Sequence, residues 1–132
     1  MGVCIHANNG KCPIEFDMGY GGFLSLREFI GEELAGEAYT TWAKTNDSTS
    51  KEALHIICKA LHSIIGDATY NFLTQTDCEG ELTHRECKEM LDKIKPLTNN
   101  YYYGYWKREH SFEDFKTLLQ YCYSHRTKLV WR

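Results

Sequence analysis

The stretch Thr74–Glu86 (TQTDCEGELTHRE) separates two apolar helical patterns, and the rest of the chain is arranged around it. Thr83, followed three residues later by Glu86, forms a capping box, which is a side-chain signal of a helix N-terminus. The apolar residues that follow recur every three to four positions, and Pro96 cannot continue a helix. We therefore expect a helix from about His84 to just before Pro96. Its expected buried residues are Cys87, Met90, Leu91 and Ile94.

The same stretch partly matches a calcium-binding loop between two helices. Such loops place oxygen ligands at alternate positions, a glycine for a sharp turn at the sixth, and a bidentate glutamate at the twelfth. With Gly80 as the sixth residue, the candidate metal ligands are Asp77, Glu79 and Glu86. The first position is then Gln75, which is neutral where the strongest ligand belongs. Because Glu86 cannot cap a helix and chelate an ion at once, we favour an acidic, solvated turn and keep calcium binding as the alternative.

This loop and the N-terminal region resemble a group of small bacterial and phage proteins. The run Thr76–Leu82 (TDCEGEL), followed by Glu86 and Cys87, is similar to a loop in which Ser or Thr precedes Asp, Cys, an acid, Gly and Glu. Other similar residues are Met1, Gly2, Gly19–Phe23 and Arg27. Related loops can carry His where this chain has Gln75, a departure that weakens a metal site. The resemblance implies an anti-defence (anti-CRISPR) inhibitor of a bacterial nuclease, and it implies no particular reaction.

Length, composition and charge fit one intracellular domain over residues 1–132. Hydrophobic content of 42% and charged content of 25% are ordinary values for a globular protein of this size. Residues 1–97 carry 9 basic and 15 acidic side chains, whereas residues 98–132 carry 6 and 3. This weak bipolarity favours a protein partner over nucleic acid. Because neither a secretory signal nor a membrane-spanning run is visible, we expect a cytoplasmic protein with six reduced cysteines.

Both ends of the chain predict β-structure. Asn8-Asn9-Gly10 separates two alternating runs, Val3–Ala7 and Ile14–Met18, which is a strong signal of a β-hairpin. The segment Lys128–Arg132 is typical of a short strand that can pair with this hairpin. The two ends of the chain would then share one small sheet.

We expect four or five helices packed on this sheet, and hence an α+β fold. Residues 19–22 are interpreted as a flexible linker, and a capping box at Ser25 as the start of the first helix. The longest pattern covers residues 51–73, and Ser111 with Asp114 caps the last helix. The expected stripe of the longest helix is Leu54, Ile57, Leu61, Ile64, Ile65 and Ala68, and that of the last helix is Phe112, Phe115, Leu118, Leu119 and Cys122.

Three sets of His and Cys residues have spacings that suit zinc, which is an alternative to calcium as a bound ion. They are Cys4, His6 and Cys12 on the hairpin, His55, Cys58 and His62 on the longest helix, and Cys122 with His125 on the last helix. Ordinary packing accounts for the same residues, since reduced cysteine is among the most buried residue types, and we favour it. Only Cys12 and Cys78 are expected to be exposed.

The segment Tyr101–Trp106 (YYYGYW) is the densest aromatic run in the chain. Such a run can pack in the core, anchor a protein interface or stack on bases. Only Lys107 and Arg108 adjoin it directly, too few basic residues for a phosphate-binding track. The candidate partner-binding residues are therefore Tyr101, Tyr102, Tyr105 and Trp106, together with Glu79 and Glu81 of the loop.

The function expected from these features is binding. No nucleophile-elbow, zinc-protease or paired-cysteine motif is present, so we expect no enzymatic activity. We predict a small intracellular interaction protein that binds and modulates a macromolecular partner, with no role at a membrane. The alternative is a metal-binding protein whose zinc or calcium ion is structural or catalytic.

Overall fold

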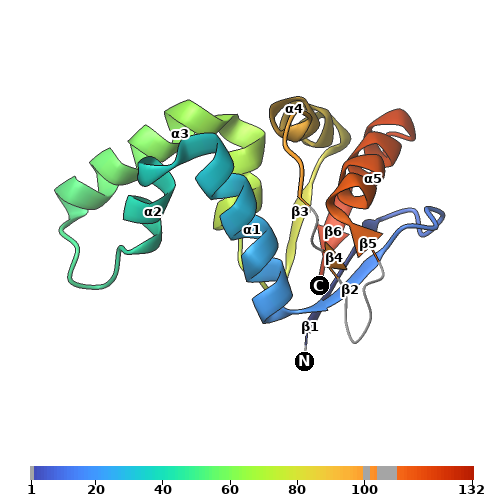
Figure 1. The fold of residues 1–132 in the computed structure, drawn as a ribbon, viewed down its shortest axis with the longest axis horizontal. Coiled ribbons are helices and arrows are strands. Elements are labelled where there is room, and N and C mark those ends of the chain that lie inside the picture. The colour runs from blue at the N-terminus through green and yellow to red at the C-terminus, as the bar shows by residue number, and fades with distance from the viewer. Residues whose placement is uncertain (1, 100–101, 104–109) are drawn as a thin grey trace.

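The computed structural model describes residues 2–99, 102–103 and 110–132, which form an α+β fold (Figure 1). Its main sheet is built from both ends of the chain. Strands β1 (Gly2–Ala7) and β2 (Phe16–Gly19) form an antiparallel pair. Strand β6 (Leu129–Trp131) lies between β1 and the short strand β3 (Gly80–Leu82), giving the order β2-β1-β6-β3. The predicted hairpin and C-terminal strand are confirmed, whereas β3 was not anticipated.

The strand register places alternate apolar side chains on the face covered by the helices. Val3 is opposite Met18, and Ile5 is opposite both Phe16 and Trp131, and all five side chains are buried. The connection between β1 and β2 is longer than the two-residue turn typical of an Asn-Gly hairpin, because residues 8–15 all lie outside the strands.

The described residues form five helices, which confirms the predicted fold class. Their bounds are α1 (Tyr20–Ala35), α2 (Glu37–Ala43), α3 (Lys51–Thr74), α4 (His84–Ile94) and α5 (Phe112–Ser124). Two further strands, β4 (Tyr102–Tyr103) and β5 (His110–Ser111), pair with each other. The predicted capping boxes of α4 and α5 are both present, and all the residues expected on their buried faces are buried.

The prediction for the first helix was wrong about its start. Helix α1 begins at Tyr20, directly after β2, with Gly19 as its N-cap residue, so the expected linker is the first turn of the helix. The early start places Phe23 in the core, where the side chain is fully buried. Gly22 lies against Met18, since a Cβ atom there would come 3.5 Å from the Met18 Cβ atom. The tight junction of strand and helix therefore replaces the capping box expected at Ser25.

The prediction for the longest helix was correct in extent and partly wrong in burial. Gly66 in α3 has φ 82° and ψ 171°, values that only glycine adopts readily, and it kinks the helix. Leu61, Ile65 and Ala68 are buried, but Leu54 and Ile64 are 38% and 45% exposed. The first turns of α3 extend away from the sheet alongside α2 (Figure 1), and the buried side chains of α3 begin at Leu61.

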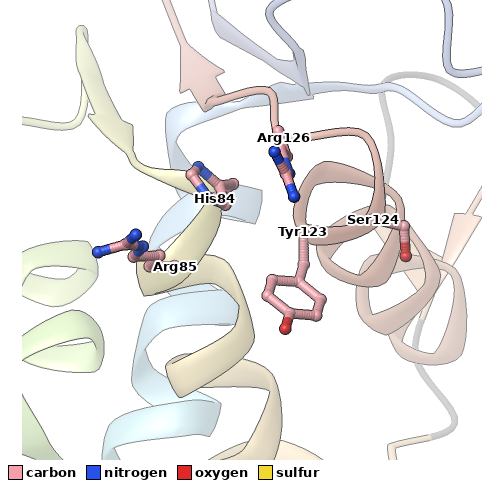
Figure 2. A pocket seen from close by; sticks show the side chains of 5 residues that line it. All are labelled: His84, Arg85, Tyr123, Ser124 and Arg126. Carbon is pink, nitrogen blue, oxygen red and sulfur yellow. The ribbon is translucent and has the colours of Figure 1, made fainter.

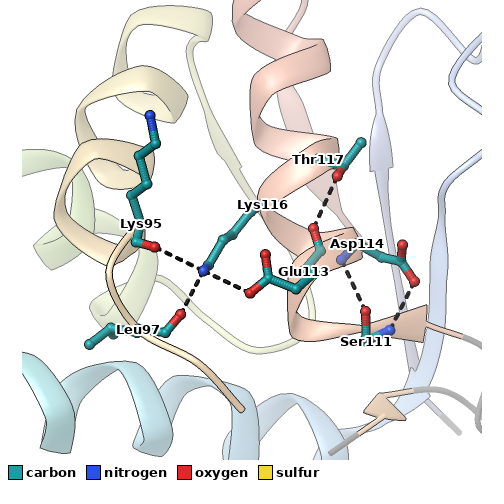
Figure 3. Close-up of polar contacts among 7 residues, drawn as sticks. All are labelled: Lys95, Leu97, Ser111, Glu113, Asp114, Lys116 and Thr117. Atoms are coloured by element: carbon teal, nitrogen blue, oxygen red, sulfur yellow. Dashed lines mark hydrogen bonds and ion pairs between the residues drawn. The ribbon is translucent and has the colours of Figure 1, made fainter. Parts of the chain in front are cut away.

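Helices α4 and α5 are joined at one end by a partly buried lysine. The Lys116 ammonium group donates hydrogen bonds to the Lys95 carbonyl (3.0 Å) and the Leu97 carbonyl (2.5 Å), and it pairs with Glu113 (2.9 Å) (Figure 3). Its side chain is only 11% exposed. A cation at these carbonyls satisfies acceptors that the end of α4 leaves unpaired and complements the helix dipole. Figure 3 also shows the reciprocal bonds between Ser111 and Asp114 that start α5.

Within the part of the chain described, no helix combines the length and apolar character needed to cross a membrane.

Candidate interaction surface

The acidic loop, residues 75–82, is fixed by hydrogen bonds from its own polar side chains. The Thr76 hydroxyl donates to the Glu79 carbonyl (2.7 Å) and accepts from the Glu79 N–H (3.3 Å). Gln75 makes a second reciprocal pair, donating to the Glu81 carbonyl (2.8 Å) and accepting from the Glu81 N–H (3.0 Å). Such local side-chain bonds define a loop conformation in the same way as an Asx or Ser/Thr turn. The loop therefore has a fixed backbone and is not a freely moving acidic turn.

The Gln75 amide also protects the edge of the sheet. Strand β3 is an edge strand, and edge strands expose backbone groups that can pair with another chain. By binding both the N–H and the carbonyl of Glu81, the Gln75 side chain occupies the hydrogen-bonding groups that a further strand would use. A glutamine suits this role because its amide carries both a donor and an acceptor. The neutral residue that weakened the calcium hypothesis therefore has a structural purpose.

Two side chains from distant parts of the chain hold the loop from below. The Trp131 indole N–H and the Arg27 guanidinium both donate to the Thr76 carbonyl, at 3.0 and 3.3 Å. Arg27 is 8% exposed, and its guanidinium carbon lies 4.3 Å from the centre of the Phe23 ring. Burial lowers the pKa of Arg27 to about 10, against an opposing effect of the Asp77 carboxylate. This group therefore stays charged at neutral pH and contributes a permanent cation beneath the acidic loop.

The side chains that the loop presents are polar and acidic. Asp77, Cys78, Glu79 and Glu81 are all exposed, and Glu81 pairs with Lys128 at 3.2 Å. A hydrogen bond from the Cys78 thiol to the Asp77 carboxylate raises the pKa of Cys78, so the thiol stays protonated and is a weak nucleophile. An open pocket of about 360 Å³ adjoins the loop and is lined by Gln75, Glu79, Gly80, Glu81, Val130, Trp131 and Arg132.

Gly80 has a different role from the sharp turn that we predicted. It lies within β3, and a Cβ atom there would come 2.2 Å from the Trp131 ring. The position therefore requires glycine for the close approach of the indole and not for an unusual backbone angle. The indole ring that bonds to the Thr76 carbonyl through its N–H group thus also packs directly on β3, at the C-terminal end of the acidic loop.

The candidate calcium ligands do not converge in the structure. Both Glu86 carboxylate oxygens are already used, one accepting from the Thr83 N–H (3.0 Å) and the other from the Asn71 amide (2.6 Å). In the described residues, no group of three or more His, Cys, Asp or Glu side chains is arranged to hold a metal ion. Metal binding by Asp77, Glu79 and Glu86 stays a prediction, which native mass spectrometry with and without a chelator would test.

Aromatic rings and a carboxylate contact two histidines of the zinc hypothesis. His62 stacks on Tyr70 and contacts Asp67, while His125 stacks on Tyr121, with ring centres 4.5 and 3.9 Å apart in the two stacks. Among the cysteines, Cys87 and Cys122 are buried, Cys78 is exposed, and Cys4, Cys12 and Cys58 are half-buried. The expected exposure of Cys12 was therefore wrong, because the loop after β1 packs this side chain against the core. All six cysteines are free.

The aromatic half of the predicted surface lies mostly outside the described residues. Tyr101, Tyr105 and Trp106 lie outside the described residues, and Tyr102 is described only through its backbone pairing with Ser111. A contribution of these rings to partner binding stays a prediction.

An apolar groove between α2 and α3 is a second exposed surface. It has a volume of about 210 Å³ and is lined by Glu37, Ala38, Thr41, Ile56, Ile57 and Ala60. Ile56 is 67% exposed, the largest exposure among the large apolar side chains of the described residues. Sequence periodicity did not reveal this surface because the same pattern predicted a helix buried along its whole length.

Comparisons with protein-family models, with curated proteins and with solved structures find no match.

Proposed function

We propose that this protein is a small intracellular interaction protein that acts by binding, and that the acidic loop is its main recognition surface. The observation that carries this proposal is that the acidic loop exposes its carboxylates while hydrogen bonds fix its backbone. Two reciprocal side-chain pairs, at Thr76 and Gln75, and the clamp formed by Arg27 and Trp131 hold it in place. A preformed loop binds without the entropy loss of ordering a flexible segment, so more of the interaction energy appears as affinity.

The chemistry of the loop favours a basic partner surface. Asp77 and Glu79 are exposed and have no ion pair with any described residue, so their charges are available to a partner. Enzymes that bind nucleic acid carry Lys and Arg tracks for phosphates. Fixed carboxylates can occupy such a track and block it. We therefore propose that the partner is a nuclease of bacterial defence, such as a CRISPR nuclease, in line with the resemblance carried by residues 76–82.

The apolar groove of α2 and α3 supports a protein partner over free nucleic acid. Aliphatic side chains such as Ile56 gain energy from burial against apolar protein surface, which a phosphate backbone does not offer. The groove and the acidic loop would then contribute apolar and electrostatic contacts, respectively.

A cleavage assay with a panel of purified RNA-guided nucleases tests the proposal. Increasing amounts of the protein should inhibit one class of nuclease, and the double variant E79K/E81K should lose that inhibition. The charge-matched control E33K/E52K changes two exposed acids on α1 and α3 and should retain it. Circular dichroism of each variant would confirm that the fold is kept.

Equal inhibition by E79K/E81K and the wild type would show that the acidic loop does not contribute to binding the nuclease. Absence of inhibition and of binding across the panel would reject a defence nuclease as the partner.

A further inference from the structure

A second site, distinct from the acidic loop, lies between the start of α4 and the end of α5. It is an open pocket of about 580 Å³ lined by His84, Arg85, Tyr123, Ser124 and Arg126 (Figure 2). In Figure 2 the His84 and Arg126 side chains face the gap between the two elements, and the Tyr123 ring stands beside it. Arg85 points away toward α3, so it borders the pocket without filling it.

The pocket is basic, and its charge is not neutralised within the described part of the chain. Two arginines, a histidine, a tyrosine and a serine line it, and none of these side chains is a carboxylate. Neither Arg85 nor Arg126 forms an ion pair with any described residue. The nearby Lys88 lies 5.9 Å from the centre of the Tyr123 ring, although its own charge is paired with Asp92 at 2.7 Å. These groups favour an anionic ligand.

Arg126 occupies a backbone position that normally belongs to glycine. Helix α5 ends in a Schellman motif, in which the Thr127 N–H bonds to the Cys122 carbonyl (3.0 Å) and the Arg126 N–H to the Tyr123 carbonyl (3.3 Å). The residue between these bonds is Arg126, with φ 50°, the only described non-glycine residue with positive φ. Glycine would relieve this strain, so the backbone at this position does not itself require an arginine. Its guanidinium projects from the turn toward the pocket (Figure 2).

The combination of groups indicates the class of ligand. A guanidinium is suited to phosphate oxygens, because its planar fork can donate two parallel hydrogen bonds. The Tyr123 side chain is 39% exposed, which leaves ring surface for stacking against a planar group. We infer that this pocket binds a small phosphorylated ligand of the nucleoside-phosphate class, with Arg126 and His84 at the phosphate and Tyr123 at the base. The site does not depend on the acidic loop or on the proposed partner.

An NMR titration of the isotopically labelled protein tests this inference. The probes are adenosine 5′-monophosphate, adenosine, inorganic phosphate and a mixed-sequence single-stranded oligonucleotide. We expect adenosine 5′-monophosphate to produce saturable shifts in the amides of residues 84–85 and 123–126, and adenosine to bind more weakly. Tyr123→Leu should weaken binding of the nucleotide and leave that of inorganic phosphate unchanged.

Arg126→Gly separates binding from folding. This variant should lose at least about tenfold in affinity for the nucleotide, because the main phosphate contact is removed, while its melting temperature is equal to or higher than that of the wild type. Lys59→Ala, which removes an exposed charge on α3, is the control for the change in net charge. The inference is overturned if no saturable shifts are seen or if Arg126→Gly binds the nucleotide with unchanged affinity. It is also overturned if the oligonucleotide binds much more tightly than adenosine 5′-monophosphate, which would indicate a nucleic-acid track.

Discussion

Replacing Gly80 by alanine should destabilise the protein strongly, although the added group is one methyl. The new Cβ atom would come 2.2 and 2.4 Å from two carbons of the Trp131 ring and 2.7 Å from its nitrogen. The ring cannot retreat, because it is fully buried with its centre 5.9 Å from that of Phe23 and 5.3 Å from that of Phe72. Overpacking of this kind costs about 1–3 kcal/mol. Displacing the indole also breaks its bond to Thr76, which adds about 1 kcal/mol.

The expected loss is thus about 2–4 kcal/mol in the free energy of unfolding, or roughly 10 °C in melting temperature for a chain of this length. Urea denaturation followed by tryptophan fluorescence and thermal denaturation followed by circular dichroism would measure both quantities. Gly21→Ala is the matched control, since Gly21 lies in α1 with no atom within 4 Å of the added Cβ. That variant should be unchanged or more stable by up to about 1 kcal/mol. A Gly80→Ala protein as stable as the wild type would refute the close packing of indole and strand.

Three further outcomes follow from the described contacts. Lys116→Met should lower the free energy of unfolding by about 1.5–3 kcal/mol, because it leaves two carbonyls without their charged donor, and urea denaturation would show it. Arg126→Gly should raise the free energy of unfolding by about 1 kcal/mol, because glycine adopts the positive φ without strain. A less stable Arg126→Gly protein would show that the arginine backbone is not strained at this position. Burial raises the pKa of the Cys4 thiol to about 11 from 9.0, so its contribution to stability is complete below pH 9 and is lost between pH 9 and 11. Cys4→Ala should remove that part of the alkaline loss in a series of unfolding curves, and an unchanged pH profile would contradict it.

Sequence patterns predicted the elements whose signals are local. The capping boxes at Thr83 and Ser111 were both correct because their bonds join residues only three positions apart. The box expected at Ser25 failed for a tertiary reason. Burial of Phe23 and the contact of Gly22 with Met18 favour a helix that starts earlier, and no pattern within the helix records that contact.

The sequence predicted the acidic residues of the candidate site but not the side chains that hold the loop backbone in place. The exposed carboxylates at Asp77 and Glu79 follow from composition alone, but the groups that fix the loop come from elsewhere in the chain. Arg27 is 49 residues from the carbonyl it binds, and Trp131 is 55 residues away. The role of Gln75 could not be predicted without knowing that β3 is an edge strand. A strand of three residues that includes one glycine has too little alternation to be recognised in the sequence.

The position of β6 in the sheet has a consequence for how the chain folds. Strand β1 can pair with β2 as soon as residues 2–19 exist, but its other edge is completed only by residues 129–131. Strand β3 likewise has no partner in the sheet until β6 arrives. The sheet therefore closes through contacts between residues more than 120 positions apart, such as Ile5 and Trp131. Pairing between residues so far apart forms slowly, because closing a long loop costs conformational entropy. We therefore expect the helices to form before the sheet is complete. Until β6 pairs with it, the open edge of β1 is exposed to mispairing.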